Sequence, residues 1–224
     1  MKKEVNGYYH IKYTGQQYPE REMISRSKEF YEYMDKRRSV REIDQKSVPK
    51  EIIENVIKTA ATAPSGAHKQ PWTFCAIADP VLKKKIREAA EKEEYESYNG
   101  RMSERWLNDL KPMATNWEKP FLEESPWLIV VCKRVYEMDE NEKANNYYVN
   151  ESVGIACGML ITAIHNAGLA TLTHTPSPMN FLTKLLGRPE NERAFLLLPV
   201  GYPKADALVP ELSRKNLEEM AVFY

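Results

Sequence analysis

The 224-residue chain has few of the residues that build small crosslinked or metal-bound folds. Its three cysteines, Cys75, Cys132 and Cys157, are far apart and lie in apolar runs. An odd number of cysteines without a CxxC spacing argues against a disulfide framework and a zinc site, so we expect three reduced, buried thiols. The four histidines are equally scattered, without metal-ligand spacing. We therefore expect no metal cofactor.

The sequence also lacks an excess of charge of one sign and a long apolar run. Its 32 basic and 32 acidic residues cancel, so no overall field attracts nucleic acid or an anionic membrane. The longest apolar stretch, residues 153–164, is shorter than the roughly 20 residues that cross a bilayer. Residues 1–6 do not open a signal peptide. We expect a cytoplasmic protein with neither a nucleic-acid nor a membrane partner.

What the sequence does contain is enough chain for one domain, with clear helical and strand patterns. Residues 1–26 show little periodicity and are expected to form an irregular N-terminal arm. Helices are expected at 27–37 with Ser27 as N-cap, from Pro49 to the break at Pro64, from Pro80 to about 91, at 150–166 and at 181–186. Strands are expected at 72–78, 127–135, 169–175 and 194–200. This pattern predicts a single α+β domain over 27–224, with a C-terminal arm from about 203.

Residues 91–120, called here the cover segment, are dense in charged and aromatic side chains and lack the apolar face of a core helix. Such a segment is typical of a mobile cover over a site or of an excursion from the main body. The helix expected at 150–166 is instead apolar on most sides. It should therefore be buried, either by the core or by a second subunit.

Two short motifs are candidates for binding a phosphorylated planar ligand. Residues 37–41 read RRSVR and place three guanidinium groups and a hydroxyl, the donors that a phosphate takes, in five residues. Residues 64–66 read PSG, a turn whose glycine allows the backbone to approach a flat ligand closely. Taken alone, the first is equally a solvated basic turn or a short nucleic-acid patch, and the second an ordinary connection.

Three further polar residues are candidates for the same site, but none of them indicates a function by itself. Arg214, near the C-terminus, is by itself an ordinary surface arginine. Thr173 and Thr175 follow an apolar strand and could offer a hydroxyl to a ring nitrogen, although threonine is also a good strand former.

Taken together, these segments resemble the FMN-dependent nitroreductase superfamily. The resemblance rests on RRSVR at 37–41, APSG at 63–66 followed by Pro71-Trp72, PVGYP at 199–203 and the late Arg214. Within the superfamily, the chain is most similar to the iodotyrosine deiodinase family, from about Tyr18 to Met220. That closer similarity includes residues 62–68, 105–106, 115–117 and 186–189.

The resemblance implies a nitroreductase-like α+β fold: a central mixed or antiparallel sheet flanked by helices, with a lid insertion at about 91–120. It also implies an intertwined homodimer that holds FMN at its interface. The residues that it assigns to FMN are Arg37, Arg38, Ser39, Arg41, Pro64, Ser65, Gly66, Thr173, Thr175 and Arg214. The 64–66 turn would border the flavin from the partner subunit. Thr175 is the implied catalytic residue, its hydroxyl near flavin N5, where it favours one-electron steps.

The same resemblance assigns the residues that hold a halogenated tyrosine. Glu94 would take its ammonium group, and Tyr98 and Lys119 its carboxylate. The backbone N–H of Ala67 would meet the phenolate oxygen of a ring stacked on the flavin. The implied reaction is reductive dehalogenation of 3-iodo-L-tyrosine and 3,5-diiodo-L-tyrosine to L-tyrosine and iodide. NADPH or a separate reductase is the expected electron donor, although the sequence has no nucleotide fingerprint.

Other interpretations stay open at this point. A general FMN nitro- or quinone reductase would share the flavin residues but needs no grip on an amino acid, so Glu94, Tyr98 and Lys119 argue against it. A non-catalytic flavin-binding protein would be yellow and would release no halide. A nucleic-acid module is disfavoured by the balanced charge. His174, next to Thr175, has no assigned role.

Overall fold

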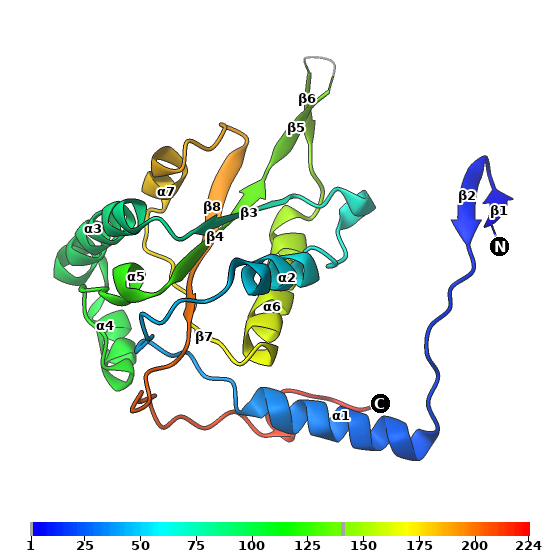
Figure 1. Cartoon of the computed structure of the whole chain (residues 1–224), viewed down its shortest axis with the longest axis horizontal. Helices are drawn as coiled ribbons and strands as arrows, with labels where there is room; N and C mark the ends of the chain where they lie inside the picture. The colour runs from blue at the N-terminus through cyan, green and yellow to red at the C-terminus, as the bar shows by residue number, and fades with distance from the viewer. Residues whose placement is uncertain (1, 140–141) are drawn as a thin grey trace. The chain divides into compact units, whose positions relative to one another are not determined.

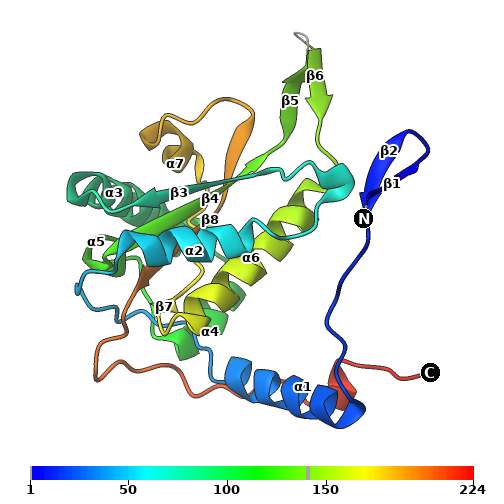
Figure 2. The same ribbon diagram turned by 45° about the vertical axis from the view of Figure 1, so that its right-hand side comes forward.

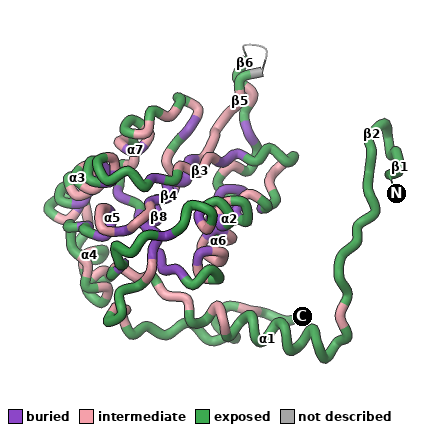
Figure 3. Tube along the Cα trace, in the orientation of Figure 1, coloured by how far each residue is buried: buried purple, intermediate pink, exposed green. Residues whose placement is uncertain are grey.

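The computed structural model describes residues 2–139 and 142–224. The chain divides into two compact units, Met1–Arg37 and Arg38–Tyr224. The first unit contains a hairpin, β1 (Lys2–Val5) and β2 (Tyr8–Ile11), and the helix α1 (Glu20–Asp35). No residue of α1 is buried (Figure 3). Its apolar side chains therefore have no core of their own to pack into.

The expectation of an irregular arm over residues 1–26 is wrong at two places. The helix α1 begins at Glu20, directly after Pro19, and its first turn carries acidic side chains that the helix dipole favours. Ser27 lies inside this helix and its hydroxyl donates to the Ile24 carbonyl at 2.9 Å, so it is not an N-cap. The hairpin turns at Asn6-Gly7, where both residues have positive φ. An Asn-Gly pair between two strands is a hairpin signal that is already present in the sequence.

The second unit is organised around a four-stranded antiparallel sheet in the order β3-β4-β8-β7. Its strands are β3 (Trp72–Ile77), β4 (Trp127–Arg134), β8 (Glu192–Gly201) and β7 (Ala170–Thr171). The α+β class is confirmed, and the sheet takes the antiparallel form of the two expected. The strand expected at 169–175 pairs continuously only over β7, and His174 then makes a separate bridge to Leu197. Leu172 and His174 are nevertheless buried and Thr173 and Thr175 exposed, as alternation along an extended chain requires.

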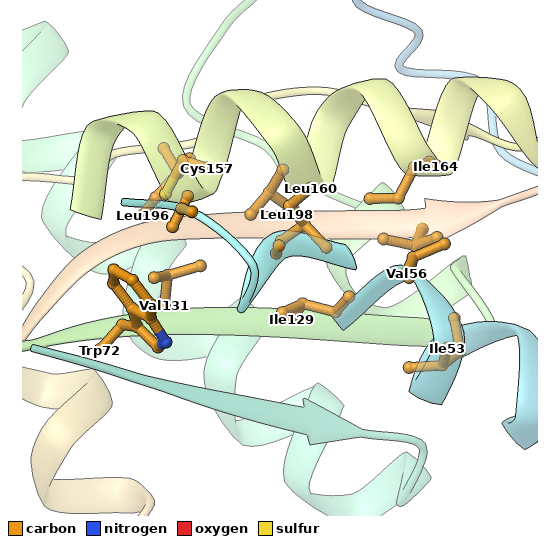
Figure 4. Close-up of a cluster of buried hydrophobic side chains, with 14 of the residues drawn as sticks. Ile53, Val56, Trp72, Ile129, Val131, Cys157, Leu160, Ile164, Leu196 and Leu198 are labelled. Atoms are coloured by element: carbon orange, nitrogen blue, oxygen red, sulfur yellow. The ribbon is translucent and has the colours of Figure 1, made fainter. Parts of the chain in front are cut away.

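One face of the sheet is covered by α2 (Lys50–Ala60) and α6 (Val149–Asn166). Figure 4 shows side chains from both helices pointing onto the strands, with Val56 of α2 and Leu160 of α6 over Ile129 and Leu198. The expected start of α2 at Pro49 is confirmed. The expected end of α6 near Gly168 is confirmed as well, since this glycine has a φ of 74° just beyond the helix.

The other face is covered by α3 (Pro80–Glu96), α5 (Phe121–Glu124) and α7 (Asn180–Leu185), as Figures 1 and 2 show. Ile86, Leu122 and Leu182 from these helices are fully buried against Leu128 and Leu197. Because strand side chains alternate between faces, each strand supplies both layers.

The cover segment is largely helical. It includes the end of α3, a wide helical turn at Ser97–Arg101, α4 (Glu104–Leu110) and a short turn at Lys111–Met113. The helix expected to stop near 91 thus runs on to Glu96. The hairpin of β5 (Tyr136–Asp139) and β6 (Glu142–Asn145) and the turn at Leu217–Glu219 were not predicted from the sequence, whereas the turn expected at 64–66 continues into a short helical turn at Gly66–His68. Among the described helices, none has the length and apolar character needed to cross a membrane.

All three cysteines are free thiols, as expected, but only Cys132 and Cys157 are buried. Cys75 is half-buried on β3. Its thiol pKa is lowered to about 7, mainly by a hydrogen bond with the Cys132 thiol. The expectation that all three are buried is therefore wrong for Cys75.

Candidate functional site

A cavity of about 220 Å³ lies between the cover segment and the chain that follows β7. It is lined by Arg41, Glu94, Ser97, Tyr98, Met102, Trp106, Leu110, Thr115, Lys119, Phe121, Leu172, Thr173, His174, Thr175 and Ser177. Parts of the chain far apart in sequence thus meet here. The segment after Arg38 joins them because Val40 N–H donates to the Thr171 carbonyl at 3.2 Å, which places Arg41 beside the end of β7.

The cavity contains a buried ion pair between Glu94 of α3 and Lys119, just before α5. Lys119 Nζ lies 3.4 Å from Glu94 Oε2, and the two side chains are only 4% and 11% exposed. Burial raises the pKa of Glu94 and lowers that of Lys119, while the attraction between the two opposes both shifts. This ion pair, which is largely shielded from solvent, presents one anion and one cation side by side. That arrangement complements a zwitterion.

Tyr98 completes the polar end of the cavity. Its hydroxyl donates to the Thr115 carbonyl at 3.4 Å, and its ring centroid lies 5.4 Å from Lys119 Nζ, a cation–π distance. Lys119 Nζ also donates to Thr115 Oγ1 at 3.4 Å and to the Asn116 carbonyl. The structure therefore brings the three residues expected to hold the substrate into one cavity, with Lys119 beside both Glu94 and Tyr98.

His174 lies in the same cavity with its side chain buried. Among the described residues its Nε2 has no hydrogen-bond partner, and the Phe121 ring packs edge-on at 5.8 Å between centroids. Burial, together with the nearby positive charges of Lys119 and Arg41, lowers the pKa of His174 to about 3. The imidazole is therefore neutral at physiological pH. It adds an uncharged polar group to a cavity that already holds two cations.

The residues expected to hold FMN fall into three groups. Arg41, Thr173 and Thr175 line the cavity, with both threonines exposed. Arg38 donates from Nη2 to the Pro210 carbonyl, which brings the C-terminal segment that carries Arg214 towards residues 38–41. Ser39 forms a β-bridge with Thr171 of β7. Arg37 is the last residue of the first unit.

The third group, the turn expected at Pro64, Ser65, Gly66 and Ala67, does not line this cavity. It lies on the opposite face of the sheet at the start of α6, where Gly66 N–H donates to Ser152 Oγ at 3.4 Å (Figure 2). A Cβ on Gly66 would lie 3.1 Å from the Tyr147 carbonyl, tighter than an ordinary contact, so a larger residue would require a small shift of its neighbours. Within one chain, the predicted flavin and substrate residues are thus divided between two faces.

The chemistry of the cavity fits a flavin mononucleotide at its mouth. Thr173 and Thr175, both exposed, line the same cavity as Arg41. Guanidinium and hydroxyl groups are the donors that a phosphate and a flavin edge accept. No group of three or more His, Cys, Asp or Glu side chains within the described ranges is placed to hold a metal ion.

The cavity residues that were not predicted from the sequence are Ser97, Met102, Leu110, Phe121, Leu172 and Ser177, and His174 had no role assigned to it. Trp106 and Thr115 appeared only as part of the family resemblance. The one available signal was the alternation of residues 172–175, which places His174 on the opposite side of the chain from its threonine neighbours.

Comparison with known proteins agrees with this geometry. The Nitroreductase family profile matches residues 34–202. An iodotyrosine deiodinase of Haliscomenobacter hydrossis is 60% identical over 96% of this chain and 97% of its own length. The human iodotyrosine deiodinase 1 is 51% identical over 95% of this chain and 74% of its own length.

A solved structure of oxidised iodotyrosine deiodinase bound to FMN and 3-iodo-L-tyrosine superposes with a TM-score of 0.74 and 31% identity. The match covers 86% of this chain and 99% of that one. With the profile, the sequence identity and the superposition in agreement, this chain belongs to the nitroreductase family and, within it, to the iodotyrosine deiodinases.

Proposed function

We propose that this protein catalyses the FMN-dependent reductive dehalogenation of halogenated tyrosines, such as 3-iodo-L-tyrosine, to L-tyrosine and halide. The buried pair of Glu94 and Lys119 carries the proposal, because it lies in one cavity with Tyr98 and with the threonines expected at the flavin. The relative with FMN and 3-iodo-L-tyrosine bound supports the same pairing of cofactor and substrate.

The proposed role of the 94–119 pair is to select an amino acid. The substrate ammonium takes Glu94 as partner, and the substrate carboxylate takes Lys119 and the Tyr98 hydroxyl. In the free protein each charge of the pair neutralises the other at 3.4 Å. A ligand with only one of the two charges would leave the other member of the pair buried and less well compensated, which costs free energy. A zwitterion satisfies both.

The proposed cofactor site uses Arg37, Arg38, Ser39, Arg41 and Arg214 for the phosphate and the polar edge of FMN, with Thr173 and Thr175 against the ring system. The exposed side chains of Thr173 and Thr175 and the place of Arg41 in the cavity support this assignment. When bound, FMN supplies the two electrons that, with a proton, replace the carbon–halogen bond by carbon–hydrogen. Thr175 is the proposed hydroxyl donor near N5, and Ala67 N–H the proposed donor to the phenolate.

The proposed role of the cover segment is to close the site as a lid. Trp106, Met102 and Leu110 line the cavity from α4 and its flanks, and Trp106 is 52% exposed. Apolar side chains over the ring of a bound halotyrosine would exclude water from the reacting bond. The residues at the charged end remain fixed by the ion pair.

We further propose that the active form is a homodimer whose partner brings the 64–67 turn to this cavity. The outer face of α6 carries Gly154, Ile155 and Gly158, and Ile155 is 47% exposed. A Cβ added to either glycine would meet nothing within 4 Å in this chain, so no contact inside the chain requires glycine there. Two glycines four residues apart let a second helix approach closely.

The electron donor and compartment are proposed from the sequence. NADPH, acting directly or through a separate reductase, is the proposed source of electrons, and the cytoplasm the proposed location. Mixing the FMN-loaded protein anaerobically with NADPH, with and without a flavin reductase, would show which route reduces the flavin.

The test of the function is anaerobic turnover of 3-iodo-L-tyrosine by the FMN-loaded protein with dithionite as reductant, with tyrosine and iodide quantified. We expect stoichiometric tyrosine and iodide, and a strongly raised KM for Glu94→Gln. 4-Nitrophenol serves as a parallel substrate that needs no amino-acid grip. Fast reduction of the nitro group without tyrosine formation would instead identify a general flavin reductase, and a yellow protein inactive on both a flavin-binding protein.

A further inference from the structure

One face of α3 carries four charged side chains that all reach the segment 119–125. Lys83, Arg87, Glu91 and Glu94 follow one another at spacings of four, four and three residues, so they form one stripe along the helix. Lys83 Nζ donates to the Ser125 carbonyl at 2.6 Å and to the Glu123 carbonyl at 3.1 Å. The N-terminal end of the stripe, at Lys83, therefore binds the C-terminal end of α5.

The middle of the stripe is a cross-brace. Arg87 donates from Nε to Glu123 Oε2 at 2.7 Å and from Nη1 to Glu91 Oε2 at 2.6 Å. The pKa of Arg87 is raised, mainly by the bond to Glu123. The guanidinium thus ties α5 to α3 and at the same time fixes the orientation of the Glu91 carboxylate.

The other carboxylate oxygen of Glu91 binds Lys119, which lines the cavity. Glu91 Oε1 accepts a hydrogen bond from the Lys119 backbone N–H at 2.8 Å, and the Glu91 side chain is only 13% exposed. One turn further along the same helix, Glu94 takes the Lys119 ammonium. Two carboxylates on one rigid helix therefore hold Lys119, one by its backbone and one by its side-chain end.

We propose that Glu91 is a positioning residue, oriented by Arg87, that sets the reach of Lys119 across the cavity and thereby the affinity for the amino-acid end of the substrate. This inference rests on the proposed function for its consequence in binding, although the contact itself does not. Glu91 does not line the cavity. It acts only through the placement of Lys119.

The test compares Glu91→Met, which removes the acceptor, with Glu91→Gln, which keeps an oxygen for the Lys119 N–H. Glu88→Met, an exposed position one turn earlier on α3, is the matched control. A hydrogen bond to a charged group is worth enough to change affinity about tenfold. We expect the Kd of 3-iodo-L-tyrosine to rise about tenfold in Glu91→Met and roughly threefold in Glu91→Gln, with the control unchanged and kcat at saturation nearly constant.

A readout independent of turnover comes from protein labelled with ¹⁵N-lysine. We expect the Lys119 amide proton to shift upfield and to exchange faster in Glu91→Met, and its ammonium signal to broaden, with Glu91→Gln in between. Unchanged Lys119 signals in Glu91→Met would overturn the proposal. So would shifted signals with unchanged substrate affinity in a protein whose wild type binds 3-iodo-L-tyrosine.

Arg87→Met keeps the proposal falsifiable if Glu91→Met does not fold. It leaves the Glu91 acceptor in place but removes its brace. We expect the Kd of 3-iodo-L-tyrosine to rise about threefold in Arg87→Met, and an unchanged Kd, or a rise of about tenfold or more, contradicts the assigned order of roles. If the wild type does not bind 3-iodo-L-tyrosine, the proposed function fails. The Lys119 signals then decide the positioning role by themselves.

Discussion

Replacing Glu94 and Lys119 singly and together separates the stability of their ion pair from its role in binding. Removing Glu94 as Glu94→Gln leaves the Lys119 ammonium, on a side chain 4% exposed, without its counter-charge. Thr115 Oγ1 and the Asn116 carbonyl remain as acceptors. We therefore expect a loss at the lower end for a broken buried pair, about 2 kcal/mol of unfolding free energy.

The second single variant, Lys119→Met, leaves Glu94 buried without its cation. Burial already raises the pKa of Glu94, and without Lys119 nothing comparable opposes that shift. A carboxyl whose folded pKa is raised contributes stability that is present at low pH and is lost as pH rises through the folded pKa. The variant should therefore become less stable relative to wild type as pH is raised above the ordinary range of a glutamic acid.

The double variant Glu94→Gln/Lys119→Met leaves no buried charge without a partner at these two positions. It should recover at least about 1 kcal/mol relative to the sum of the single losses, because two neutral groups avoid the desolvation of two ions. Binding behaves differently. All three variants should bind 3-iodo-L-tyrosine at least about tenfold more weakly, since each lacks a charge that the zwitterion needs.

The assay is equilibrium unfolding in urea at fixed protein and FMN concentrations, because ligand and subunit association both shift apparent stability. Binding is followed on the same samples by titration with 3-iodo-L-tyrosine. Strictly additive losses in the double variant would refute the stabilising pair. Wild-type affinity in the double variant would refute its role in recognising the substrate.

Three further predictions concern other parts of the chain. Burial lowers the pKa of His174 to about 3, so this residue contributes stability that is present above its ordinary pKa and is lost as pH falls. In His174→Gln the free energy of unfolding, measured in urea, should therefore fall less steeply below pH 6.5, by up to about 1.4 kcal/mol per pH unit. An equally steep fall in the variant would contradict this. Gly158→Arg should leave the fold intact, because a Cβ there meets nothing within 4 Å, but split the proposed dimer in sedimentation velocity; a dimer that persists places the interface elsewhere. Cys75, with a thiol pKa of about 7, should react with a maleimide before Cys132 and Cys157, whose pKa values are raised; mass spectrometry of the labelled peptides reads the order, and prior labelling of either buried thiol would disprove it.

Most of the fold could be predicted from local pattern. Pro49 is the N-cap of α2, Pro80 is the first residue of α3, and Gly168 follows the end of α6, because a ring without an N–H and a residue tolerant of positive φ have few other places. The apolar runs at 127–132 and 194–200 sufficed to predict β4 and β8, although each strand also includes a pair of charged residues at one end. The first unit was less predictable. Because α1 has no buried residue, its apolar side chains do not form the periodic buried stripe by which a helix is predicted from sequence.

The candidate site was predictable as a set of residues but not as an arrangement. The family resemblance named Glu94, Tyr98 and Lys119, and the structure brings them together. It could not show that the pair is buried or that Glu91 holds the Lys119 backbone. Those facts depend on how α3 packs beside residues 119–125, which no short window of sequence contains.

By itself, then, the sequence determined the family, the α+β class and the chemical identity of the residues expected at FMN and substrate, because motifs and periodicity are local properties of the chain. Only the tertiary structure decided that the threonines at 173 and 175 share a cavity with the 94–119 pair, and that the 64–67 turn lies on the far face of the same sheet. It also decided that His174 is buried and neutral. Burial, charge pairing and the choice of face arise from packing between distant segments, and that packing exists only in the folded chain.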